Sequence, residues 1–215
     1  MRNAERYRFE NQTPGEEVAN SITHAVGALL SLAATTILIV YAALEGSAIK
    51  VVSFSIFGFT LFLLYLVSSL YHGIQSPFAK RVFHIFDHSA IFVLIAGTYT
   101  PVTLIAIQGG FGWSLFGVAW GLAIAGMIAT LVFFEKARYF NVALYIAMGW
   151  LIVLAIPVLL NRFSTLALMW LVIGGVSYTA GVLFYRAKRM RYHHMVWHVF
   201  VLGGSVCHFF MMFYL

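Results

Sequence analysis

The feature that most constrains this chain is a series of seven continuous apolar stretches, each long enough to cross a membrane as a helix. About 20 helical residues cross the roughly 30 Å hydrocarbon core of a bilayer. The stretches do not alternate with polar residues and their linkers are short, which excludes a transmembrane β-barrel. The sequence therefore predicts an all-α, polytopic bundle of seven transmembrane helices near residues 22–44, 50–71, 82–107, 111–134, 140–160, 165–185 and 194–215.

One domain accounts for the whole chain, residues 1–215, because we find no internal repeat or second unit. With 62% hydrophobic and 9% charged residues, the composition excludes a soluble domain. The first 20 residues are polar and are predicted to form a cytoplasmic N-terminal segment. Within it, Thr13, Pro14 and Glu16 have the pattern of an N-cap, a first helical position and a capping box. They predict a short interfacial helix that leads into the first span.

The positive charges predict the orientation, because loops rich in Lys and Arg stay in the cytoplasm. If the N-terminus is cytoplasmic, only Lys50 and Arg162 lie outside. We therefore expect a cytoplasmic N-terminus and an external C-terminus. The net charge of +6 then reflects topology and contact with anionic lipid, and no basic groove for nucleic acid is found. The residues predicted inside are Arg2, Arg6, Arg8, Lys80, Arg81, Lys136, Arg138, Arg186, Lys188, Arg189 and Arg191.

Two further patterns concern helix packing. Pro101 and Pro157 lie inside the third and fifth spans, where proline kinks a helix, and a hinge and a purely structural kink are both compatible with them. Small residues recur every four positions in the fourth span and predict a surface at which helices approach closely in lipid. These small residues are Gly117, Gly121, Ala125 and Ala129.

Polar side chains gather at the predicted inner ends of the second, third and seventh spans. Ser68 and His72 are four residues apart and share a helix face, as do His194 and His198. Asp87 is the only aspartate of the chain and lies in the third span, where an acidic group needs a partner. At a rise of about 1.5 Å per residue, Asp87 and His198 lie at similar depths. We therefore expect these five residues to converge.

This convergence has the chemistry of a zinc site. Three neutral imidazoles, from His72, His194 and His198, leave one position of a tetrahedral zinc ion open, as catalytic zinc sites require. A water molecule can fill that position. Asp87 could accept a proton from it or orient it, and the Ser68 hydroxyl could hydrogen-bond it or stabilise a developing oxyanion.

The remaining histidines and the single cysteine are interpreted as packing residues. Cys207 stands alone, which excludes an internal disulfide. Other cofactors fit poorly, because no lysine lies mid-helix for a retinal Schiff base, and Ser68 and Asp87 would crowd a haem. A proton-coupled transporter is compatible with Asp87 and the histidines as a relay. The histidines interpreted as packing residues are His84, His88, His193 and His208.

Several motifs resemble those of a known family. An acidic residue, Asn and His precede the first span, followed by Ser-x3-His, a downstream Asp and a final His-x3-His. The chain resembles the bacterial hemolysin III family, within the progestin and adiponectin receptor superfamily. The matching stretches are Glu-Glu-Val-Ala-Asn-Ser-Ile-Thr-His at 16–24, Ser-Ser-Leu-Tyr-His at 68–72, Phe-Asp-His-Ser-Ala-Ile at 86–91, Ala-Gly-Thr-Tyr-Thr-Pro at 96–101, and the segment from His193 through Trp197-His198 to Cys207-His208.

The resemblance implies a seven-helix fold opposite in topology to G-protein-coupled receptors, in the bacterial inner (plasma) membrane. It implies zinc held by His72, His194 and His198, with Ser68 and Asp87 contacting the water on the metal. Eukaryotic relatives are regarded as hormone receptors with a ceramidase-like hydrolase activity, and the bacterial name derives from lysis of red cells.

The first motif of the family corresponds to Glu17, Asn20 and His24. Their spacing places all three on one face of the first helix. We expect them to support the ligand histidines by hydrogen bonding or packing.

Two functional hypotheses follow. The first is a zinc-dependent hydrolase that cleaves an amide or ester bond of a lipid near the inner leaflet, with the substrate entering sideways from the bilayer. The second is a zinc-stabilised sensor or regulator of membrane state without turnover, and the hemolytic label of the family is a further possibility. A cavity open to lipid favours hydrolysis, whereas a closed site with four protein ligands favours a structural metal. The sequence is compatible with both hypotheses and does not indicate an oligomeric state.

Overall fold

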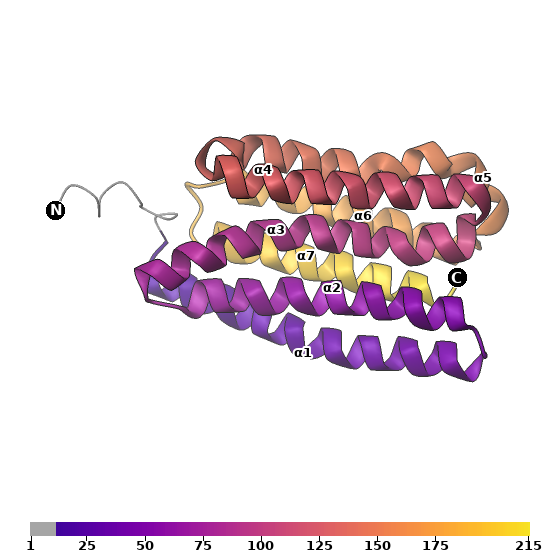
Figure 1. Cartoon of the computed structure of the whole chain (residues 1–215). Helices are drawn as coiled ribbons and strands as arrows, with labels where there is room; N and C mark the ends of the chain where they lie inside the picture. The colour runs from indigo at the N-terminus through magenta and orange to yellow at the C-terminus, as the bar shows by residue number, and fades with distance from the viewer. Residues whose placement is uncertain (1–11) are drawn as a thin grey trace.

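The computed structural model describes residues 12–215, except for the side chains of residues 134–139. These residues form an elongated bundle of nearly parallel and antiparallel helices (Figure 1), and the described part of the chain contains no strand. The α-helices are α1 (Pro14–Leu44), α2 (Ala48–Gly73), α3 (Pro77–Pro101), α4 (Gly109–Gly149), α5 (Ile156–Arg162), α6 (Thr165–Arg186) and α7 (His193–Met212).

The predicted seven spans are confirmed, because the described residues contain seven helical segments long and apolar enough to cross a membrane. The third span continues past α3 through a π-helix, η2 (Val102–Ile107). Helix α4 supplies both the fourth span and the start of the fifth, with a break at Phe133, where φ is −121° and ψ is 29°. The fifth span then passes through a 3-10 helix, η3 (Trp150–Ala155), into α5.

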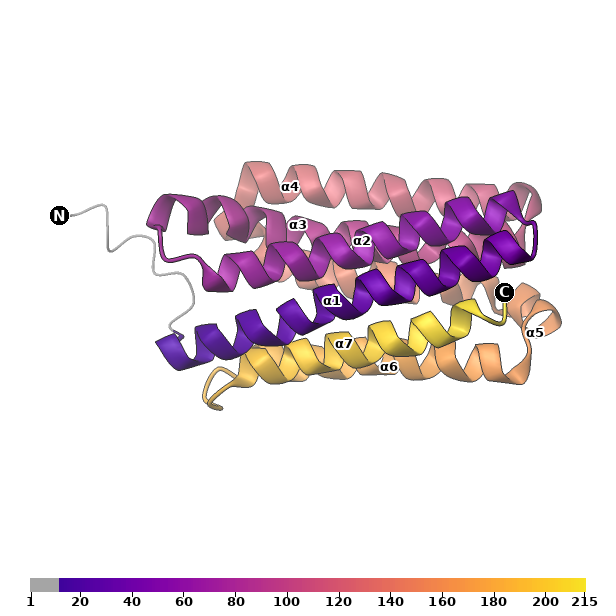
Figure 2. The same ribbon diagram turned by 90° about the horizontal axis from the view of Figure 1, so that it is seen from below.

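The order of the helices determines which residues meet at each end of the bundle. Helices α1, α3 and α7 begin at the end at which α2 and α6 finish, on the left of Figures 1 and 2. We call this the histidine end, because it carries His72 and His194. Helix α7 packs against α6 and α1, and Figure 2 shows it between these two helices.

The start of α1 has the predicted capping box. The Thr13 hydroxyl accepts a hydrogen bond from the Glu16 amide at 3.3 Å, and the Thr13 amide donates to Glu16 Oε2 at 2.8 Å. From Pro14 the helix runs without interruption to Leu44. Residues 14–20 are therefore the first turns of α1 rather than a separate interfacial helix.

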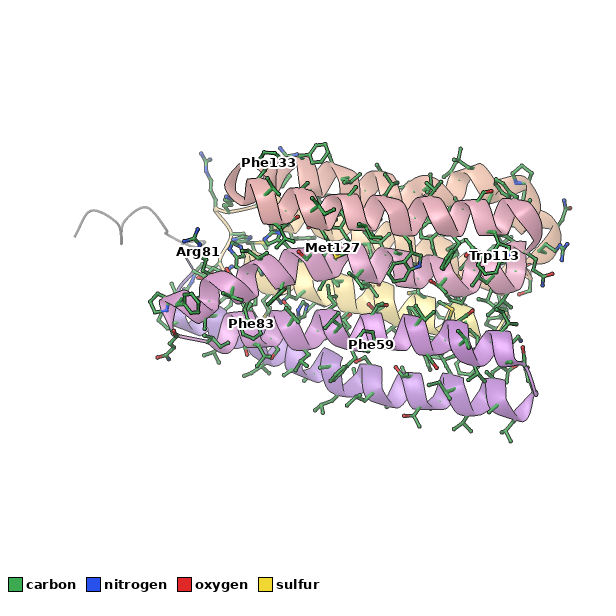
Figure 3. The ribbon with its side chains drawn as sticks, in the orientation of Figure 1. Phe59, Arg81, Phe83, Trp113, Met127 and Phe133 are labelled. Atoms are coloured by element: carbon green, nitrogen blue, oxygen red, sulfur yellow. The ribbon has the colours of Figure 1, made fainter. Side chains whose placement is uncertain are left out.

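The outer surface of the bundle is apolar, as expected for contact with lipid chains. Phe59, Trp113 and Phe133, labelled in Figure 3, are 62%, 59% and 60% exposed. In water such a surface would be unfavourable, at roughly 25 cal/mol per Å² of apolar area. The arrangement therefore fits a multi-pass membrane protein.

The small residues of the fourth span do not form the predicted packing surface within this chain. Gly117 and Gly121 are exposed, and a Cβ atom at either position would meet no atom within 4 Å. The buried face of this helix carries Ala119, Ala123 and Gly126 instead, and Gly126 leaves room for the Phe92 ring. Two faces of one helix carry small residues, so spacing alone did not identify the buried face.

Both membrane prolines coincide with departures from α-helical geometry. Pro101 is the last residue of α3 and is followed by η2, and Pro157 is the second residue of α5, directly after η3. Tyr99 donates a hydrogen bond of 2.8 Å to the Met148 carbonyl near the end of α4. This bond joins the two irregular regions, because Tyr99 precedes Pro101 and Met148 precedes η3.

Candidate metal centre

Three histidines from two helices converge at the histidine end. His72 lies in the last turn of α2, and His194 and His198 lie in the first two turns of α7. Each offers a ring nitrogen, and these nitrogens lie within 4.8 Å of one another. The residues are 4%, 5% and 0% exposed. The convergence expected from the two four-residue spacings is therefore present.

The ring nitrogens of this cluster fit a metal ion. His72 Nε2 is buried and has no hydrogen-bond partner in the described part of the chain. A buried polar atom without a partner costs about 1–3 kcal/mol, and such atoms are rare in folded proteins. A tetrahedral zinc ion holds its ligand nitrogens about 3.4 Å apart, so small rotations of the three rings would complete the geometry.

The other nitrogen of His72 is held by an acidic residue of α1. His72 Nδ1 lies 2.6 Å from Glu17 Oε2, and the Lys80 ammonium donates to Glu17 Oε1 at 2.7 Å. A carboxylate that accepts the Nδ1 proton leaves Nε2 with its lone pair directed at the cluster. Sequence reasoning missed Lys80, because nothing in its spacing indicates a contact with a residue of α1.

His24, which was expected to support the ligand histidines, packs directly on one of them. Its ring stacks on the His198 ring with centroids 3.5 Å apart and planes 17° apart. The Tyr65 ring meets His24 edge-on at 5.0 Å. The Asn20 backbone hydrogen-bonds His198, and the Asn20 side-chain amide donates to Gln12 Oε1. Glu17, Asn20 and His24 therefore all contact the cluster, Asn20 through its backbone.

Ser68 and Asp87 lie beside the cluster at the wall of a cavity. The Ser68 hydroxyl is buried, without a hydrogen-bond partner among residues 12–215. Asp87 is also buried, and its carboxylate is not part of the compact group formed by the imidazole nitrogens. Both residues line the cavity together with His24. The three candidate ligands do not line this cavity themselves, and His24, which stacks on His198, connects its wall to the cluster.

The cavity has a volume of about 170 Å³ and is lined mainly by apolar side chains. It reaches His208, which lies ten residues beyond His198 on α7 and thus about 15 Å farther along that helix. Trp150 of η3 and Thr179 of α6 also line it. The other walls include Leu64, Ile91, Leu94, Leu171, Val182 and Val201.

The remaining histidines contact other parts of the fold. His84 Nε2 and His88 Nε2 are 3.2 Å apart, and His193 Nδ1 lies 3.2 Å from a backbone carbonyl of α6. His208 Nε2 lies 3.4 Å from the Leu171 carbonyl. His88 and His208 also line the cavity. Their position there was not predicted, because a cavity wall formed by several helices has no periodicity in one sequence.

Taken together, the fold and this site define a seven-helix membrane protein with a buried histidine cluster beside an apolar cavity. A family described as haemolysin-III related matches residues 12–209, and the chain belongs to this family.

Two bacterial relatives cover nearly the whole chain. Hemolysin-3 of Bacillus cereus is 45% identical over 195 residues, which cover 91% of this chain and 89% of the relative. The hemolysin-3 homolog of Bacillus subtilis (strain 168) is 44% identical, covering 91% and 92%. The human monocyte to macrophage differentiation factor is 25% identical over 201 residues, covering 91% and 82%. These relationships support the predicted hemolysin III family and its wider receptor superfamily.

Proposed function

We propose that this protein is a zinc-dependent hydrolase that cleaves an amide or ester bond of a lipid. The observation that carries the proposal is the position of Ser68 and Asp87. Both lie at the wall of an apolar cavity, beside three buried imidazoles that supply three ligands rather than four. A site with three protein ligands leaves a position for reacting groups.

Zinc, when bound, would polarise the carbonyl of the scissile bond and activate a water molecule for attack. The side chains of the protein supply the other functions. Asp87 would take up the proton of the attacking water and return it to the leaving group. The Ser68 hydroxyl would donate a hydrogen bond to the oxygen that becomes negative. Glu17 would keep His72 in the tautomer that presents Nε2.

The shape and polarity of the cavity support a lipid substrate. An acyl chain could extend from Asp87 towards His208 past apolar side chains. Helices α4 and α6 make little direct contact, and a hydrogen bond of 3.0 Å from Trp150 Nε1 to Thr179 Oγ1 connects η3 with α6 at this part of the wall. We propose that a lipid enters sideways between the fifth span and α6.

The proposed location is the plasma membrane of a bacterium, with the histidine end in the cytoplasm. The excess of Lys and Arg in the loops of this end supports that orientation. The reacting groups would then lie at the depth of the inner leaflet.

A zinc-stabilised sensor or regulator is the second candidate. The distribution of the ligands over two helices supports it, because a metal ion there would hold those helices together. Helix α7 packs mainly on α6 and α1, so a metal ion held by His72 and by two residues of α7 would tie α2 to α7. In this case, zinc stabilises the bundle and no lipid is consumed.

Product analysis separates the two candidates. Purified protein in bilayers that contain a lipid amide and the corresponding ester should release a fatty acid from at least one of them, as measured by mass spectrometry. His194→Ala should lose both zinc and product. Glu45→Gln, at the opposite end of α1, serves as the matched control and should keep both. Zinc-loaded wild type that releases no product from any lipid class would contradict hydrolysis and leave the regulator.

A further inference from the structure

Glu16 makes two separate sets of hydrogen bonds, one within α1 and one to the far end of the sequence. Its Oε2 atom accepts from the Thr13 amide at 2.8 Å and from the Thr13 hydroxyl at 2.9 Å, which closes the capping box. Its Oε1 atom accepts from the amide of Tyr192 at 2.9 Å. The capping box itself uses only one of the two carboxylate oxygens.

Tyr192 is an unusual residue at which to begin a helix. Its φ of 57° and ψ of 20° place it in the left-handed region, which is unfavourable for a residue with a side chain. Its carbonyl accepts the first helical hydrogen bond of α7, from the Val196 amide at 3.0 Å. The Tyr192 side chain makes no capping hydrogen bond at this helix start. The conformation of Tyr192 therefore sets where α7 begins, and His194 follows two residues later.

The geometry points to Glu16 as a positioning residue for the candidate metal centre: its Oε1 atom holds Tyr192 in the left-handed conformation and so fixes the start of the helix that carries His194 and His198. The neighbouring residue acts on the other ligand helix, because Glu17 holds His72. The first turn of α1 is thus a clip with two arms, Glu16 on α7 and Glu17 on α2. The expected effect on metal affinity rests on the proposed function, whereas the expected effect of Glu16 on the order of Tyr192 does not.

The Glu16 arm is a hydrogen bond to a charged acceptor, so its loss should shift the equilibrium between the ordered and frayed starts of α7 by roughly ten- to a hundredfold. Without it, the left-handed state of Tyr192 would compete with extended states in which the first turn of α7 is frayed. A ligand that binds only the ordered state loses affinity in proportion to the fraction that is lost. Glu16 should therefore affect metal affinity although it is not a ligand.

Glu16→Gln separates the clip from the helix cap. Glutamine serves in a capping box as well as glutamate does, but it has one carbonyl oxygen and cannot accept from both Thr13 and Tyr192. Thr13→Ala is the complementary variant, because it removes the side-chain part of the cap and leaves both oxygens of Glu16. Glu45→Gln removes a carboxylate at the opposite end of α1, where it pairs with Lys50, and is the control for charge.

Two measurements on the full-length protein test the clip. In Glu16→Gln, amide hydrogen exchange of the peptide that covers Tyr192–Val196 should be roughly ten- to a hundredfold faster in the metal-free protein. The affinity for Co²⁺, a spectroscopic substitute for Zn²⁺, should fall in proportion to the ordered fraction that is lost, and the visible absorption spectrum should change. Thr13→Ala and Glu45→Gln should leave the exchange of this peptide and the Co²⁺ spectrum unchanged.

A second pair of variants tests whether Glu16 acts by holding Tyr192 in the left-handed conformation. Tyr192→Gly and Tyr192→Ala both remove the ring, but only glycine adopts a positive φ without strain. We expect Glu16→Gln to change Co²⁺ affinity less than about twofold in the Tyr192→Gly background and by at least the wild-type factor in the Tyr192→Ala background. If Glu16→Gln changed Co²⁺ affinity equally in the two backgrounds, the inference that Glu16 acts through the conformation of Tyr192 would be overturned.

The outcomes distinguish this inference from the proposed function. Unchanged exchange at Tyr192–Val196 in Glu16→Gln would overturn the clip, whatever the metal does. If the wild type binds no Co²⁺ or Zn²⁺, the proposed metal centre fails, and faster exchange in Glu16→Gln would still support the clip. If exchange quickens but Co²⁺ affinity and spectrum are unchanged, Glu16 orders α7 without positioning the ligands, and the inference is overturned.

Discussion

His72 Nδ1 lies 2.6 Å from Glu17 Oε2, although the two residues are 55 positions apart in the chain. The contact joins α1 to α2 at the histidine end and assigns the two nitrogens of His72 different partners. Nδ1 faces the carboxylate, and Nε2 faces the other two histidines without a hydrogen-bond partner in the described residues. Lys80 occupies the second oxygen of Glu17 and so keeps the carboxylate in place.

This relationship predicts that Glu17 controls metal affinity without being a ligand. Glu17→Ala should lower zinc affinity by about 10–100-fold, the usual effect of removing a carboxylate that orients a metal-bound histidine. Competition with a chromophoric chelator measures the change, and Glu45→Gln is the control for loss of a carboxylate. Wild-type affinity in Glu17→Ala would mean that packing alone orients His72.

Metal content and stability should change together. The wild type should contain about one zinc ion per chain, and His72→Ala should contain none. Because the ion binds the folded state preferentially, it should stabilise that state by about 2.7 kcal/mol at a free concentration of 100 times its Kd. Chelation should therefore lower the Tm of the wild type by several degrees and leave that of His72→Ala unchanged. An unchanged Tm of the wild type after verified zinc removal would exclude a stabilising role.

Acid should release the metal. An imidazole binds zinc only when neutral, and its ordinary pKa is about 6.5. Protons bind the free ligands and compete with zinc, so the stabilisation from the metal is present above that pH and is lost as pH falls through it. Melting curves with and without chelator should diverge at pH 7.5 and converge towards pH 5. A difference that does not shrink at all between pH 7.5 and pH 5 would contradict histidine ligation.

The sequence predicted the parts of the fold and site that depend on periodicity within one helix. The seven spans, the capping box at Thr13 and the shared face of His194 and His198 follow from such spacings. The convergence of His72 with these two histidines was expected because all three lie at the same end of the bundle. Contacts that depend on how helices are placed relative to one another could not be predicted. Lys80 reaches Glu17, and Gly117 faces outward, because helix rotation and tilt are determined by the packing of the whole bundle.

The orientation rests on the charges alone and has a direct test. Reporter fusions after Arg8 and after Arg191 should show a cytoplasmic position, and a fusion at Leu215 should show an external one. The expected pattern follows from eleven Lys and Arg residues on one side against Lys50 and Arg162 on the other. Cytoplasmic signals from all three fusions would contradict an odd number of spans.

Asp87 separates catalysis from architecture, because it lies at the cavity wall and not among the imidazole nitrogens. Asp87→Asn keeps the size of the side chain but removes its ability to accept a proton. If the protein is a hydrolase, this variant should keep its zinc and its Tm and lose lipid hydrolysis by about 10²-fold or more, the usual scale of general acid–base catalysis.

The same variant gives a different result if zinc only stabilises a sensor. In that case, Asp87→Asn should leave the cellular phenotype almost intact, and wild-type protein should accumulate no lipid product. His194→Ala is the matched comparison, because it should lose the metal under either function. Retained hydrolysis in Asp87→Asn would reject Asp87 as the base while leaving the metal centre in place, since the three histidines bind without it.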